Sequence, residues 1–118
     1  MDFSWSDELD AYRQEVRNFA RSAATDELLD EVKKGVEDAG QGLLMRQLHD
    51  EIDRRGWLRM CWPREFGGEA KSPWYQYIFF EELHAQGIPY SLGTAGMIGP
   101  AIMKFGTEAQ KTKYLPSI

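Results

Sequence analysis

The stretch from Gly56 to Gly68 constrains the fold more than any other part of the sequence. It reads GWLRMCWPREFGG, so three large aromatic side chains stand between one glycine and a closing glycine pair. The proline at position 63 removes a backbone donor and favours an extended conformation at Trp62, while the glycine pair permits the positive φ angles of a sharp turn. We therefore predict an irregular, buried connector whose aromatic rings pack under the helices on both sides.

Helical periodicity governs the chain before this connector. Apolar residues recur three or four positions apart over residues 9–23, and Ser4 or Ser6 can cap that helix ahead of an acidic first turn. Residues 26–42 are charged and end in several glycines, which favours a short helix followed by a mobile loop. A further helix is expected over residues 43–55, where a glycine follows the last turn.

More helices are expected after the connector. The Ser-Pro pair at 72–73 is suited to begin a helix that runs to Gly87. The stretch 91–105 is helical in pattern, and Pro100 either kinks it or begins a new helix there. Residues 107–110 form a capping box that opens a last helix. Alternating β-branched runs are absent, so the sequence predicts an all-α fold, an orthogonal or bundle-like domain of about five or six helices.

Length, charge and the single cysteine narrow the classes of function. The 118 residues are expected to form one domain, and the net charge of −5 without a basic helix face argues against nucleic acid as a partner. No apolar run approaches the ~20 residues of a membrane helix, and the acidic amino terminus lacks the pattern of a signal peptide. Cys61 has no intrachain partner, so a cytoplasmic location and a buried, inert thiol are expected.

Few polar residues indicate chemistry by themselves. His49 lies among three acids, which could mark a metal site, although a solvated helix face is the simpler interpretation without a second nitrogen or sulfur ligand. Adjacent Glu81 and Glu82 point about 100° apart on a helix, so they fit caps or ion-pair partners better than a facing acid and base. The first helix carries arginines four positions apart, namely Arg13, Arg17 and Arg21. These arginines form either a solvated surface or a stripe that binds an anion.

Glycine recurs at every third position from Gly93 to Gly99. Each costs roughly 1 kcal/mol relative to alanine inside a helix, so some contact should compensate. Spaced by three, the glycines would lie along one side of a helix and leave a groove that either another helix or a ligand could fill. Glycine spacing of this kind also occurs in dinucleotide-binding loops, but no strand precedes it here, and we reject that reading.

Three stretches together resemble one family. The connector GWLRMCWPREFGG, the sequence FEEL at 80–83 and FGTEAQKTKYLP at 105–116 are similar to signatures of the amino-terminal helical domain of acyl-CoA dehydrogenases. They follow one another in the family's order and spacing between residues 56 and 116. The resemblance implies that residues 1–118 are the amino-terminal part of a longer flavoenzyme of lipid metabolism, which also has a β domain and a second helical domain.

The resemblance also carries expectations about chemistry. The family is FAD-dependent and desaturates acyl-CoA thioesters: a glutamate base removes the α proton while the β hydrogen leaves as a hydride to the flavin, which passes electrons to an acceptor. The base and most flavin contacts are expected downstream of residue 118, so no catalytic, cofactor-binding or metal-binding residue is assigned here. The resemblance implies that this domain forms part of the wall of the acyl cavity, in an enzyme that is a homo- or hetero-oligomer. The expected substrate-binding residues are Tyr90, Gly93, Thr94 and Met97.

A second interpretation stays open. The chain could be a free-standing, non-enzymatic helical module that pairs with a partner protein. Both interpretations predict an exposed apolar patch on the isolated domain, where other domains or a partner dock. A helical nucleic-acid or regulatory domain fits less well, because the charge balance is acidic.

Overall fold

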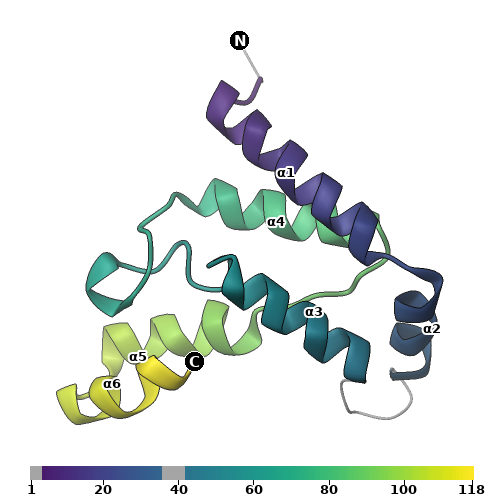
Figure 1. Cartoon of the computed structure of the whole chain (residues 1–118). Helices are drawn as coiled ribbons and strands as arrows, with labels where there is room; N and C mark the ends of the chain where they lie inside the picture. The colour runs from purple at the N-terminus through teal and green to yellow at the C-terminus, as the bar shows by residue number, and fades with distance from the viewer. Residues whose placement is uncertain (1–3, 36–41) are drawn as a thin grey trace.

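Six α-helices make up the part of the chain that the computed structural model describes, residues 4–35 and 42–118 (Figure 1). They are α1 (Asp7–Ala23), α2 (Asp26–Gly35), α3 (Leu43–Arg54), α4 (Pro73–Ala85), α5 (Gly99–Phe105) and α6 (Glu108–Tyr114). Three short helical segments complete the fold: the 3-10 turns η1 (Arg64–Phe66) and η3 (Leu115–Ser117), and the π-helix η2 (Gly93–Ile98). No strand occurs in these residues, which confirms the all-α prediction. The loop expected near residue 40 lies outside the described residues.

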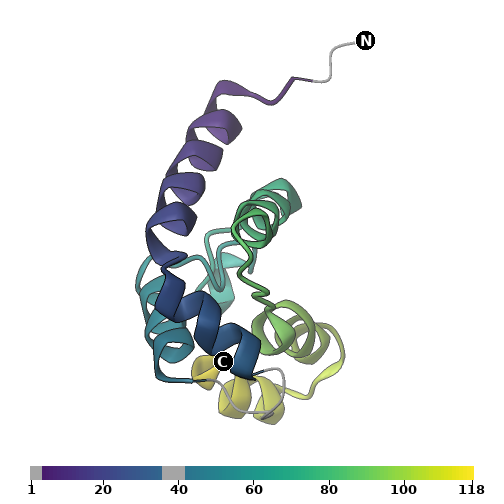
Figure 2. The same cartoon turned by 90° about the vertical axis from the view of Figure 1, so that its right-hand side faces the viewer.

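The helices pack in pairs. Helix α1 crosses α4, α2 lies against α3, and α5 and α6 fold back on one another at the carboxyl end (Figure 1). In the turned view, the packed pair of α1 and α4 lies above α5 and α6 (Figure 2). None of the described helices combines the length and the apolar character that crossing a bilayer requires.

The helix boundaries follow local signals. The Ser6 side chain accepts a hydrogen bond from the Leu9 amide at 3.3 Å, so Ser6 rather than Ser4 caps α1. The capping box that opens α6 is present in full, with Thr107 and Gln110 each bonding the other's backbone amide. Pro100 stands in the first turn of α5, which confirms that it begins a new helix.

The connector is irregular and holds the first and fourth helices together. Trp57 is buried, and its ring meets Tyr12 and Phe19 of α1 and Phe79 of α4 edge to face. Phe66 is only partly buried, unlike the two tryptophans, because it sits in the exposed turn η1. The connector therefore acts as predicted, chiefly through its tryptophans.

An ion-pair network also links α1 to α4. Glu82 is only 3% exposed and accepts hydrogen bonds from Arg13 at 2.6 Å and from Arg17 at 2.9 Å. Arg13 also bonds Glu81 at 2.6 Å. The ion-pair interpretation of the two glutamates is thus confirmed. The expected solvated arginine surface is wrong for Arg13 and Arg17, because the glutamates of α4 lie opposite them, and holds for the exposed Arg21.

Candidate functional site

The residues expected to bind substrate lie on one short segment between α4 and α5. Tyr90 is buried, with 4% of its surface exposed, whereas Gly93, Thr94 and Met97 face outward from η2. Met97 is 73% exposed. The structure therefore separates the set into an internal anchor, Tyr90, and an open surface formed by the other three residues.

Tyr90 is anchored by both histidines of the chain. Its hydroxyl lies 2.6 Å from Nδ1 of His49 on α3, and its carbonyl oxygen lies 2.9 Å from Nε2 of His84 on α4. Burial raises the pKa of the Tyr90 phenol, so the hydroxyl stays protonated at neutral pH. The segment that leads into η2 is thus tied to two helices.

The contact with Tyr90 corrects the expectation for His49. Its ring is half-buried and hydrogen-bonded to a core tyrosine rather than lying on a solvated face. Within residues 4–35 and 42–118, no group of three metal-ligating side chains comes together, so the structure gives the metal interpretation no support. Sequence analysis missed both histidines as anchors, because His49 lies 41 positions from its partner and no local pattern signals the contact.

The backbone of η2 has wider turns than an α-helix. The amide of Gly99 donates to the carbonyl of Thr94, five residues earlier, as a π-helix requires. The next carbonyl, that of Ala95, would in the same register accept from the nitrogen of Pro100, which has no hydrogen. The indole Nε1 of Trp62 donates to this carbonyl instead, at 2.8 Å. A side chain of the connector thus satisfies the buried acceptor that the proline leaves open.

The glycines of this region serve different purposes. A Cβ atom at Gly93 would meet no atom within 4 Å, whereas one at Gly96 would lie 3.2 Å from Nε2 of Gln76. At Gly99 a Cβ atom would overlap the ring of Trp62. The predicted groove lined by all three glycines is therefore absent, because the π-helical turn rotates positions spaced by three away from a common side. Gly99 is needed for packing, and Gly93 leaves open space.

A small cavity lies between the connector and η2. Its volume is about 70 Å³, and its lining includes Trp62, Cys61, Gln76 and Leu92. Burial raises the pKa of the Cys61 thiol, which lies 3.4 Å from the carbonyl oxygen of Ser72. The half-buried Cys61 therefore holds little thiolate, as expected for an inert residue.

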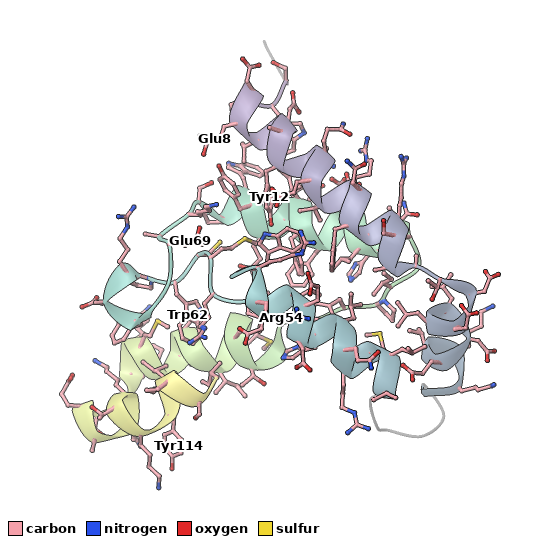
Figure 3. All side chains as sticks on the ribbon, in the orientation of Figure 1. Glu8, Tyr12, Arg54, Trp62, Glu69 and Tyr114 are labelled. Atoms are coloured by element: carbon pink, nitrogen blue, oxygen red, sulfur yellow. The ribbon has the colours of Figure 1, made fainter. Side chains whose placement is uncertain are left out.

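An apolar groove runs beside η2 along α5 and α6. It has a volume of about 560 Å³ and an almost entirely apolar lining. Its most exposed large side chains are Met97, Ile98, Phe105 and Tyr114. Tyr114 projects from the outer edge of the molecule, whereas the side chain of Trp62 lies on the side of the connector that faces α5 (Figure 3). This groove matches the exposed apolar patch that the sequence predicted.

Comparison with known proteins shows which family has this architecture. The family described as acyl-CoA dehydrogenase, N-terminal domain, matches residues 6–118. The chain belongs to this family. The acyl-CoA dehydrogenase FadE26 of Mycobacterium tuberculosis is 31% identical over 118 residues, which are all of this chain and 30% of that protein. FadE29 of the same organism is 38% identical over 77 residues, or 65% of this chain and 20% of that protein.

Two solved structures share this fold. The ChsE4-ChsE5 complex from Mycobacterium tuberculosis matches 98% of this chain and 28% of that one, with a TM-score of 0.78 and 30% identity. The Tcur3481-Tcur3483 steroid ACAD matches 99% of this chain and 30% of that one, with a TM-score of 0.80 and 35% identity. The matched part of this acyl-CoA dehydrogenase domain thus spans 30% of the length of FadE26 and 20% of the length of FadE29.

Acyl-CoA dehydrogenases as a family depend on FAD. Around η2 the described residues of this domain present exposed apolar atoms and no converging set of donors and charges that would hold a flavin. This acyl-CoA dehydrogenase domain does offer an exposed glycine, Gly93, at which a Cβ atom would meet no other atom within 4 Å.

Proposed function

We propose that this chain is the amino-terminal domain of an FAD-dependent acyl-CoA dehydrogenase, which introduces an α,β double bond into an acyl-CoA thioester. The family match over residues 6–118 supports the reaction. The base and most flavin contacts would belong to the portion of the enzyme that follows residue 118 in the relatives. An electron-transfer acceptor would reoxidise the flavin, and the protein would work in the cytoplasm, since its single cysteine has no intrachain partner for a disulfide.

The open space beside the backbone of Gly93 is the main support for assigning η2 to the acyl-binding wall. A backbone without a Cβ atom allows an apolar group to approach closely, and here no other atom fills that space. Thr94 and Met97 flank the position and are exposed. Tyr90 would act from behind as the anchor that holds the wall in place.

The similar structures favour a particular substrate and assembly. One is named a steroid ACAD, and both are named as pairs of different proteins. We extend this to the present protein: its substrate is a CoA thioester with a bulky, polycyclic acyl group, and it works as a hetero-oligomer. The free space at Gly93 suits a group wider than a straight chain.

The flavin spectrum of the whole protein tests the reaction. We expect the protein purified from its source, with any bound partner, to show a flavin band that bleaches when a steroid acyl-CoA is added without oxygen. A short straight-chain acyl-CoA should bleach it more slowly. A colourless species of 13.6 kDa would contradict the proposal and favour the interaction module instead.

Substitution of Gly93 tests the acyl-binding wall. In the whole enzyme, Gly93→Leu should lower kcat/KM for a bulky acyl-CoA roughly tenfold or more, because the new side chain occupies the space for the acyl group. The effect on a short acyl-CoA should be much smaller, and Gly93→Ala should lie between. Steady-state kinetics with both substrates measures this. An equal loss with both would mean that Gly93 serves folding alone.

A further inference from the structure

The indole of Trp62 supports the proposed acyl wall from behind. Three of the four residues that the wall depends on lie on the π-helix η2, and Tyr90 precedes it. Such wide turns are rare in proteins. In the described structure, the Nε1 hydrogen bond to the Ala95 carbonyl is the side-chain hydrogen bond that η2 receives from the connector. It reaches the element 33 positions away in the sequence.

The position of the indole is itself fixed from several sides. Trp62 is 4% exposed, and the Arg59 guanidinium lies 5.9 Å from its ring centroid. Its backbone carbonyl accepts a hydrogen bond from the Ala70 amide at 2.9 Å. The ring fills the space that Gly99 leaves by lacking a Cβ atom. A ring held in this way can set the position of the backbone to which it donates.

We propose that Trp62 is a positioning residue for acyl binding: its indole N–H replaces the donor that Pro100 lacks and so holds η2, with Gly93, Thr94 and Met97, in the shape that receives the acyl group. This inference rests on the proposed function of η2 as part of the acyl wall. It assigns Trp62 no contact with the substrate.

The test removes the indole donor and keeps an aromatic side chain at position 62. In the whole enzyme, Trp62→Phe should raise KM for a bulky acyl-CoA about fivefold, the effect of one lost hydrogen bond, while kcat with a short acyl-CoA stays within about twofold. Hydrogen exchange should accelerate at the amides of residues 96–99. Replacing Trp62 by 3-benzothienylalanine, which has sulfur in place of the N–H and keeps the ring shape, should do the same even if the phenylalanine variant folds poorly.

A second substitution separates the hydrogen bond from ring packing. Pro100→Ala supplies an amide at position 100 that can donate to the Ala95 carbonyl. Combined with Trp62→Phe, it should restore KM for the bulky substrate towards the parent value. The matched control is Trp57→Phe on the same connector. The Trp57 ring packs on α1 and α4, so this variant should leave KM unchanged for the bulky and for the short acyl-CoA.

The outcomes are distinct. A rise in KM that Pro100→Ala reverses supports the inference. If the rise is not reversed, or if Trp57→Phe produces it equally, Trp62 acts through packing alone and the inference fails. If Gly93→Leu changes substrate preference and Trp62→Phe does not, the inference fails and the proposed function stands. If neither substitution changes the substrate preference, the proposed acyl-binding role of η2 fails, and the inference that rests on it fails with it.

Discussion

Glu82→Ala should lower the free energy of unfolding by about 3 kcal/mol, because it leaves the arginines of α1 facing α4 without their buried partner. The Glu82 carboxylate accepts hydrogen bonds from Arg13 and Arg17, and Arg13 is only 14% exposed at its side chain. The Nε of Arg13 already has no hydrogen-bond partner in the described structure. Urea unfolding followed by tryptophan fluorescence measures the loss.

The neighbouring glutamate provides the control. Glu81 bonds the same Arg13, but its side chain is 44% exposed, so Glu81→Ala should cost less than about 1 kcal/mol. Equal losses for the two variants would contradict the role of burial.

The pH dependence of unfolding tests whether the stabilising effect of Glu82 comes from its negative charge. Hydrogen bonds from Arg17, and then from Arg13, lower the pKa of Glu82 below its ordinary value of 4.5, against the opposing effect of burial. A carboxylate with a lowered folded-state pKa adds stability that is complete above pH 4.5 and is lost as pH falls through the folded-state value. The difference in unfolding free energy between the parent and Glu82→Gln should therefore shrink below pH 4.5.

Gly68→Ala should cost about 3 kcal/mol and disturb the connector directly. A Cβ atom at this position would overlap the backbone carbonyl and Cβ of Trp62, and a backbone neighbour cannot turn aside as a flexible side chain can. The chain approaches itself closely here because the Gly68 amide donates to Pro63 and the Ala70 amide to Trp62. The variant should unfold at lower urea concentration, with altered near-ultraviolet circular dichroism from Trp62.

The preceding glycine separates crowding from backbone strain. Gly67 has a φ of 86°, and a Cβ atom there would meet nothing within 4 Å. Gly67→Ala should therefore cost only about 1 kcal/mol, the penalty of the left-handed conformation for a residue other than glycine. A larger loss at position 67 than at position 68 would contradict the close-approach argument.

The elements that the sequence predicted well depend on neighbours in the chain. Ser6 caps α1, Thr107 and Gln110 form their box, and Pro100 opens α5, because each signal acts within about four residues. The connector was also predictable, since Pro63 and the glycine pair restrict the backbone locally. Two of the three family signatures, the connector and residues 105–116, occupy such locally determined stretches.

The sequence by itself thus determined the helices, their ends, the aromatic connector and the family. Only the tertiary structure decided what the polar residues do. Glu82 meets Arg13 across 69 positions, so the sequence allowed an ion pair or a cap for Glu82 without naming its partner. Tyr90 meets His49 across 41 positions, and the local pattern of charges gave a solvated face as the simpler interpretation of His49. The register of η2 was likewise invisible, because a π-turn depends on the indole of Trp62 reaching the Ala95 carbonyl from another part of the chain. Burial and long-range hydrogen bonds arise only when helices pack, and a linear pattern does not encode which faces will meet.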